Sequence, residues 1–221
     1  MEGVRFRDRA EAGRHLAELL RGYAGREDVI VLALPRGGVP VAYEVARALG
    51  VPLDVFMVRK LGVPRHEELA MGAIAGGGVL VLDEGLIASL GIGTGQVRQA
   101  IAAEARELER RERVYRDGRA PPQLEGRTVI LVDDGLATGA TMRAAALAVR
   151  EHRPARIVIA VPVAAAETCR ELRGDADELV CAATPSPFGA VGLWYENFSQ
   201  TSDEEVRELL ARAAEPAESP R

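Results

Sequence analysis

Residues 129–141 restrict the fold of this chain more strongly than any other segment, and they read VILVDDGLATGAT. The four apolar, mostly β-branched residues 129–132 predict a strand buried on both faces, as in a parallel sheet. Asp133 and Asp134 follow where that strand ends. A turn of small residues, 137–141, then leads into an apolar helix at 142–149. This order is typical of a ligand site at the carboxyl ends of the strands of an open α/β sheet.

The chemistry of this segment points to two different groups of one ligand. Free backbone N–H groups at the start of a helix, together with the helix dipole, form an anion site. Gly139 allows close approach of the backbone, and Thr138 and Thr141 add hydroxyl donors. The two carboxylates would repel a phosphate bound there, so they must face sugar hydroxyls or a cation such as Mg²⁺. A sugar phosphate lying across the strand end and the turn satisfies both requirements.

Three other phosphate-site motifs do not match in spacing. A Walker A loop requires Gly-Lys-Ser/Thr, and residues 129–141 contain no lysine. A phosphatase-type pair requires two aspartates separated by one residue, whereas Asp133 and Asp134 are adjacent. The glycines at 91–95 lack both the spacing of a dinucleotide fingerprint and a preceding strand. A hinge before a helix capped by Thr94 is the better interpretation.

Residues 129–141 resemble the signature of type I phosphoribosyltransferases. The resemblance implies that Asp133 and Asp134 hold the ribose hydroxyls of phosphoribosyl pyrophosphate (PRPP). It implies that the following turn holds the 5′-phosphate, through Ala137, Thr138, Gly139, Ala140 and Thr141. It further implies a Mg²⁺ cofactor, with Asp133 and Asp134 as its ligands directly or through water.

A second strand-to-helix turn, LPRGGVP at 34–40, resembles the pyrophosphate loop of the same family. Gly37 and Gly38 permit unusual backbone angles, and the guanidinium of Arg36 can bind phosphate oxygens in a fork. An ordinary connection between a strand and a helix is the alternative interpretation.

Residues 59–78 are rich in glycine and are expected to form a long mobile loop, which resembles the flexible catalytic loop of the family. Arg59 and Lys60 match the basic pair at its start, and their charge would stabilise the leaving pyrophosphate. Closure of the loop would exclude water from the site. Lys60 is the single lysine of the chain; a surface residue without a role is the alternative.

The order of elements predicts an α/β fold with a doubly wound, mainly parallel sheet. Strands are expected at 29–34, 53–58, 79–82, 129–132, 156–161 and 178–182. Helices are expected at 9–21, 39–49, 94–116, 142–149, 165–172 and 203–213. We expect a core at 1–182 that includes the N-terminal helix, a C-terminal hood or flap with a helix at 183–213, and a disordered tail at 214–221.

The acceptor site is expected in the hood, where most of the few aromatic residues lie. Phe188, Trp194 and Tyr195 either stack on a planar base or anchor the flap by packing. In hypoxanthine-guanine enzymes an acidic residue stands where this chain has Ala137, and a lysine follows the next strand, where residues 161–164 have none. A 6-oxopurine acceptor is therefore doubtful.

Composition excludes several other classes of protein. A net charge of −5 without a basic stripe argues against nucleic-acid binding. Each apolar run is too short to span a membrane, and the N-terminus has no apolar signal core, so a cytoplasmic location is expected. Cys169 and Cys181 are expected to be buried, inert thiols rather than a disulfide framework.

Together these patterns predict a Mg²⁺-dependent enzyme. It would transfer the 5-phosphoribosyl group from PRPP to a nitrogen acceptor, expected to be a nucleobase, and release pyrophosphate. The alternatives are a non-catalytic regulator or sensor that binds PRPP, and a transferase with an acceptor that is not a base. A homodimer is implied by the resemblance alone.

Overall fold

The computed structural model describes residues 5–64, 66–116 and 119–215. Its main sheet has five parallel strands in the order β2-β1-β6-β7-β8. Their bounds are Leu53–Val55 for β2, Val29–Ala33 for β1, Thr128–Val132 for β6, Arg156–Val163 for β7 and Glu178–Ala183 for β8. Every residue of the central strands β1 and β6 is buried, as their continuous apolar runs predict. The predicted α/β fold with a parallel sheet is confirmed.

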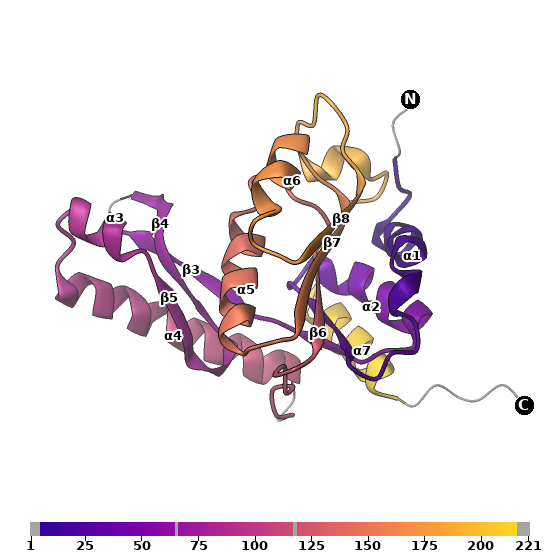
Figure 1. Cartoon of the computed structure of the whole chain (residues 1–221), viewed down its shortest axis with the longest axis horizontal. Helices are drawn as coiled ribbons and strands as arrows, with labels where there is room; N and C mark the ends of the chain where they lie inside the picture. The colour runs from indigo at the N-terminus through magenta and orange to yellow at the C-terminus, as the bar shows by residue number, and fades with distance from the viewer. Residues whose placement is uncertain (1–4, 65, 117–118, 216–221) are drawn as a thin grey trace, which may run out of the picture.

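Helices cover both faces of this sheet (Figure 1). One face carries α1 (Arg9–Leu19), α2 (Gly38–Leu49) and α7 (Asp203–Ala214), and the other carries α5 (Ala140–Glu151) and α6 (Ala166–Leu172). Successive residues of β6 alternate between the two apolar layers, because side chains along a strand point to opposite faces. Ile130 packs in the α2 layer, whereas Val129 and Leu131 pack in the α5 layer.

Two predicted helix starts are confirmed by their caps. The side chain of Asp8 accepts a hydrogen bond from the backbone N–H of Glu11 at the start of α1. The hydroxyl of Ser202 accepts one from the N–H of Glu205 at the start of α7. Both satisfy a donor that the helix itself leaves unpaired.

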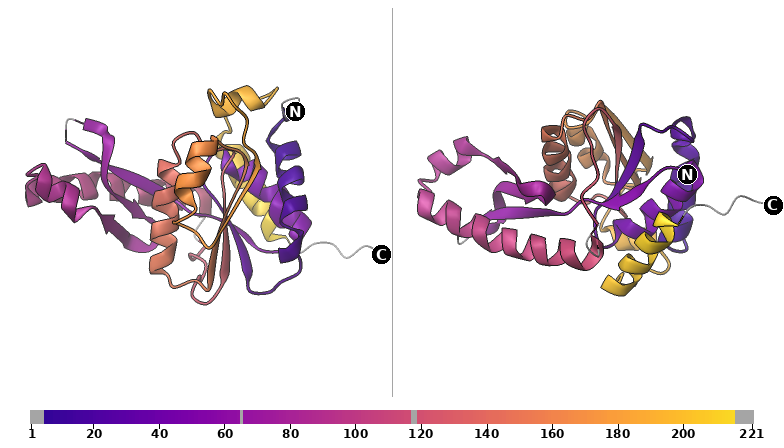
Figure 2. Two further views of the ribbon diagram at one scale, coloured as in Figure 1. Left: turned by 45° about the horizontal axis from the view of Figure 1, so that its top comes forward. Right: turned by 90° about the horizontal axis from the view of Figure 1, so that it is seen from below.

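A small antiparallel sheet, β3-β4-β5, forms a lobe that extends from one side of the main sheet (Figures 1 and 2). Its strands are β3 (Val58–Val63), β4 (His66–Ala75) and β5 (Val79–Leu82), with the turn η2 (Gly76–Gly78) between the last two. The helices α3 (Glu84–Ser89) and α4 (Thr94–Arg116) complete the lobe, and α4 packs against β3 and β4.

The expectation of a long loop at 59–78 is therefore wrong in secondary structure, since the segment forms most of β3 and β4. Leu61, Met71 and Ile74 are buried in the same apolar layer as Val97 and Leu108 of α4. Packing against this distant helix orders a segment whose own sequence has many glycines. Whether the hairpin moves during function stays a prediction.

The predicted C-terminal flap divides into two parts. Helix α7 packs on α2 and so belongs to the core. The segment around η3 (Val191–Trp194) instead pairs with the N-terminus: the N–H of Phe6 donates to the carbonyl of Trp194 at 2.8 Å, and the N–H of Glu196 donates to the carbonyl of Phe6 at 2.8 Å. The short helix η1 (Arg21–Tyr23) follows α1. Most of the predicted tail, 216–221, lies outside the described residues.

Cys169 of α6 and Cys181 of β8 are joined by a disulfide bond, so the expectation of free thiols is wrong. The crossover from β7 through α6 to β8 brings the two cysteines together, which their spacing in the sequence does not reveal. In the part of the chain that the structure describes, no helix has both the length and the apolar character needed to cross a bilayer.

Candidate active site

Two predicted segments meet where β1 and β6 end side by side. Gly37 and Gly38 follow β1, and Asp133 and Asp134 follow β6. A Cβ atom added to Gly38 would lie 2.7 Å from the carbonyl oxygen of Val132, and one added to Gly37 would overlap Oδ2 of Asp134. Only glycine allows the first turn to approach the acidic pair this closely.

The acidic pair lies in a partly buried position. Asp133 accepts a hydrogen bond at Oδ1 from the backbone N–H of Asp134, at 2.8 Å. Burial raises the pKa of Asp133 well above its usual range, and the charge of Asp134 raises it further. Burial also raises the pKa of Asp134, while the neighbouring guanidinium of Arg9 opposes that rise.

Arg9 is a site residue that the sequence analysis did not find. Its Nε and Nη2 atoms each lie 2.8 Å from Oδ2 of Asp134. Its Nη1 atom donates to the carbonyl of Ser199 at 2.7 Å, and its guanidinium lies 4.0 Å from the ring centre of Phe198. Arg9 and Asp134 are 125 positions apart, so no local pattern could have revealed the contact.

The predicted phosphate turn, residues 137–141, leads directly into α5. Gly139 precedes the helix with a φ of 69°, a left-handed conformation that favours glycine. A Cβ atom there would also come within 2.7 Å of Cγ2 of Thr168. Ala137, Thr138 and Thr141 are exposed and Ala140 is partly exposed. The first N–H groups of α5 and two exposed threonines thus lie close together in the chain, as an anion site requires.

The two predicted arginines already face carboxylates. Nη1 of Arg36 lies 3.5 Å from Oδ1 of Asp203, which also accepts a hydrogen bond from the Tyr115 hydroxyl at 2.5 Å. Nε of Arg59 lies 2.6 Å from Oε2 of Glu104, within the lobe. Among the contacts of the described residues, neither the Arg36 nor the Arg59 guanidinium contacts the acidic pair.

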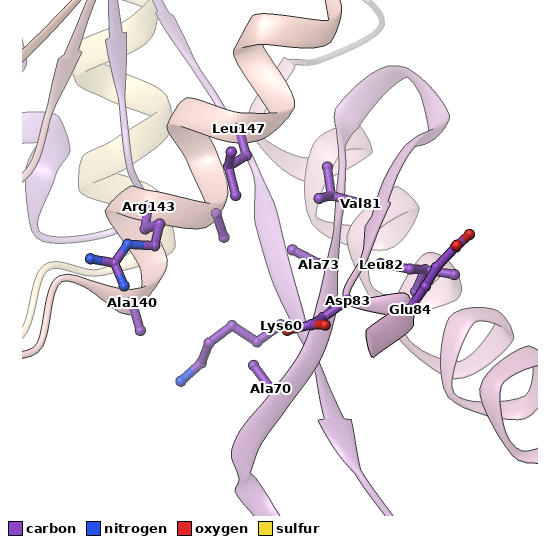
Figure 3. Close-up of a pocket in the computed structure, with 12 residues that line it drawn as sticks. Lys60, Ala70, Ala73, Val81, Leu82, Asp83, Glu84, Ala140, Arg143 and Leu147 are labelled. Atoms are coloured by element: carbon purple, nitrogen blue, oxygen red, sulfur yellow. The ribbon is translucent and has the colours of Figure 1, made fainter. Parts of the chain in front are cut away.

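Lys60 is exposed, and its side chain has no hydrogen bond or ion pair with the described residues. It lines a cavity of about 720 Å³ between the small sheet and α5. Figure 3 shows its side chain extending toward Ala140 and Arg143, at the start of α5. Lys60 and Ala140 of the phosphate turn therefore border the same cavity, although the lysine belongs to the lobe.

The predicted stacking residues differ in their surroundings. Tyr195 is only 1% exposed, and its hydroxyl donates to the backbone carbonyl of Asp134 at 2.6 Å. A ring buried in this way offers no face to a base, so Tyr195 fits the other interpretation, in which it anchors the flap by packing. Trp194 donates its Nε1–H to the carbonyl of Phe188 at 2.9 Å, and both side chains remain partly exposed. Stacking by Phe188 and Trp194 stays a prediction.

Comparison with known proteins shows which family has this arrangement. A model of the phosphoribosyl transferase domain matches residues 6–195. The chain belongs to this family. The match includes the N-terminal segment with Arg9, the acidic pair, the phosphate turn and the aromatic segment up to Tyr195.

The chain is similar to MT0597 and Rv0571c, proteins from two strains of Mycobacterium tuberculosis that are provisionally named phosphoribosyl transferases. Each is 48% identical over 208 residues, which cover 94% of this chain and 47% of the relative. The chain thus spans about half the length of these curated relatives. The crystal structure of TT1426 from Thermus thermophilus has a TM-score of 0.87 and 44% identity, and the match covers 96% of this chain and 100% of that chain.

The acidic pair fits a magnesium ion that is shared with a substrate. No group of three or more ligating side chains occurs within the described ranges. However, Oδ1 of Asp134 and Oδ2 of Asp133 accept no hydrogen bond from another described residue. Mg²⁺ commonly uses one or two carboxylates together with phosphate oxygens and water, and this donor set suits that mode.

Proposed function

We propose that this chain moves the 5-phosphoribosyl group of PRPP to a ring nitrogen of a planar acceptor, with a nucleobase as the first candidate. The observation that carries the proposal is the meeting of three parts at one edge of the sheet. These are the acidic pair 133–134, the phosphate turn 137–141 and the glycine turn 37–38. Their spacing suits a ligand with a ribose between two phosphate groups.

Each end of PRPP has a suitable partner. The 5′-phosphate would accept hydrogen bonds from the N–H groups at the start of α5 and from the hydroxyls of Thr138 and Thr141. The two ribose hydroxyls would donate to the remaining oxygens of Asp133 and Asp134. Bound Mg²⁺ would neutralise pyrophosphate charge and hold the ribose and pyrophosphate together.

In the reaction the bond between C1′ and the pyrophosphate oxygen breaks, and a bond from C1′ to the acceptor nitrogen forms. The proton of that nitrogen passes to pyrophosphate or to water. Positive charge develops on the sugar ring as the leaving group departs, and the acidic pair would stabilise it. Negative charge develops on pyrophosphate, which Arg36 and the N–H groups of the glycine turn would stabilise. Arg59 would add charge from the lobe, and so would Lys60, whose side chain has no partner among the described residues.

The experiment is pyrophosphate release from PRPP and Mg²⁺, measured with each of a panel of nucleobases. Release that depends on one base would support the proposal and identify the acceptor. Asp134→Asn should reduce turnover sharply, and unchanged rates would remove Asp134 from the mechanism. Lys60→Ala should lower kcat more than it raises the KM for PRPP; a change in KM alone would argue against its role.

A second candidate is a regulator that binds PRPP without turnover. The specific observation in its favour is that Arg9, Arg36 and Arg59 each already bind a carboxylate. PRPP binding in calorimetry, with no release for any acceptor, would favour this candidate. Release with a nitrogen compound that is not a base would favour a transferase of another specificity. A homodimer also remains a prediction, which light scattering would test.

A further inference from the structure

Arg9 links three parts of the chain at the acidic pair. It binds Oδ2 of Asp134 with two nitrogen atoms, it donates to the carbonyl of Ser199, and it lies over the ring of Phe198. The side chains of Arg9 and Asp134 are only 11% and 14% exposed. An ion pair at this depth is screened much less than one on the surface.

The position of Arg9 in α1 gives no local reason for an arginine. Arg9 is the first residue of the helix, where the helix dipole favours negative charge and disfavours a cation. The cap is already supplied by Asp8, which accepts from the N–H of Glu11. The guanidinium therefore acts in the tertiary contact with Asp134, not in starting the helix.

The contact restricts how the Asp134 carboxylate can be oriented. Oδ2 lies between Arg9 and the backbone at Gly37, where a Cβ atom would overlap it. The backbone carbonyl of the same residue is held by the Tyr195 hydroxyl. Oδ1 of Asp134 and Oδ2 of Asp133 then remain as acceptors, one for each of two vicinal hydroxyls.

We propose that Arg9 is a positioning residue that acts through Asp134, holding its carboxylate so that Oδ1 receives a ribose hydroxyl of PRPP. Arg9 itself does not contact the substrate. The inference rests on the proposed function because it assumes a ribose at the acidic pair. It makes binding of the ribose depend on a residue of the N-terminal helix, in addition to the phosphate turn and the glycine turn.

The test compares two ligands that differ in whether they contain ribose. Calorimetry with Mg²⁺ measures the Kd of PRPP and the Kd of inorganic pyrophosphate for the wild type and for Arg9→Ala. Removal of a residue that orients a ligand-binding side chain commonly lowers affinity about tenfold or more. The Kd of PRPP should therefore rise about tenfold in Arg9→Ala. Pyrophosphate, which has no ribose, should keep its affinity within about twofold. Added guanidinium chloride at low millimolar concentration should restore part of the PRPP affinity.

Arg5→Ala is the matched control. Arg5 also joins the N-terminus to the aromatic segment, with its Nη2 donating to the Tyr195 carbonyl at 3.3 Å, but it does not touch Asp134. This variant should bind PRPP like the wild type. If Arg5→Ala reproduces the loss, the effect comes from joining the two segments, and the inference is wrong. An equal loss for both ligands, or no loss of PRPP affinity, would also overturn it.

Two further variants keep the test decisive if Arg9→Ala does not fold. Arg9→Met keeps an apolar stem over Phe198 without the charge and should lose PRPP affinity. Arg9→Lys keeps the charge but has one nitrogen for several contacts, so it should lie between the wild type and Arg9→Met. A wild type that binds PRPP without turnover would overturn the transferase function and leave the Arg9 inference to be decided by these comparisons. A wild type that does not bind PRPP would overturn both.

Discussion

The hydroxyl of Thr168 donates to the carbonyl oxygen of Ala137 at 2.5 Å and so ties helix α6 to the phosphate turn. The methyl carbon of the same threonine faces Gly139, where an added Cβ atom would lie 2.7 Å away. Thr168 is buried, although it belongs to an element outside the family signature. The phosphate turn is therefore held in place by contacts with α6, the helix that follows β7.

Thr168→Val should weaken both the fold and the binding of PRPP. The substitution keeps the shape but leaves the Ala137 carbonyl without its donor, which costs about 1–3 kcal/mol. Urea denaturation would measure the loss in the free energy of unfolding, and calorimetry would measure the Kd of PRPP. Thr168→Ser retains the hydroxyl and should preserve more affinity than valine; equal affinities would show that the hydrogen bond is unimportant.

Gly37→Ala should damage the site because the new Cβ atom would overlap Oδ2 of Asp134. Relief of the overlap requires movement of the glycine turn or of the carboxylate, at a cost of about 1–3 kcal/mol. Pyrophosphate release would measure the loss of activity, and urea denaturation would measure the loss in the free energy of unfolding. Gly95→Ala is the control, since nothing lies within 4 Å of its Cβ position on α4. It should leave activity intact and change stability by less than about 1 kcal/mol; normal activity in Gly37→Ala would contradict the close approach.

Asp133→Asn should stabilise the protein near neutral pH while impairing its activity. Burial raises the pKa of Asp133 in the folded state above the ordinary value of 3.8, so the folded state binds a proton more tightly than the unfolded state. The free energy of unfolding of the wild type therefore falls as pH rises through the interval between these two pKa values. Asparagine carries no such penalty, which amounts to about 1.4 kcal/mol for each pKa unit.

Denaturation of both proteins at pH 3.5 and at pH 7 would measure this difference. The stability of Asp133→Asn relative to the wild type should increase between the two pH values. A constant difference would show that Asp133 titrates as an exposed carboxyl. Because the same substitution removes a proposed ribose ligand, stability and turnover should change in opposite directions.

Reduction of the bond between Cys169 and Cys181 should destabilise the protein. The cysteines are 12 positions apart, and closing a loop of this size contributes roughly 2–4 kcal/mol. A reductant should lower the urea midpoint of the wild type and have no effect on the Cys169→Ser/Cys181→Ser variant. Two reactive thiols in denatured protein that had not been reduced would contradict the bond.

The sequence by itself determined what depends on neighbouring residues. The buried runs of β1 and β6, the full extent of α4 and the starts of α1 and α7 follow from local periodicity. The order of strand, acidic pair, turn and helix is also local, which is why β6, the turn after it and α5 were predicted from the sequence.

Only the tertiary structure decided which distant segments meet. The contact of Arg9 with Asp134, the burial of Tyr195, the pairing of Cys169 with Cys181 and the hairpin at 58–75 each join residues through the strand order or through packing on a remote helix. Sequence periodicity shows which face of an element is apolar, but it does not show which element covers that face. For that reason the charge partner of the acidic pair was missed, although the pair itself was found.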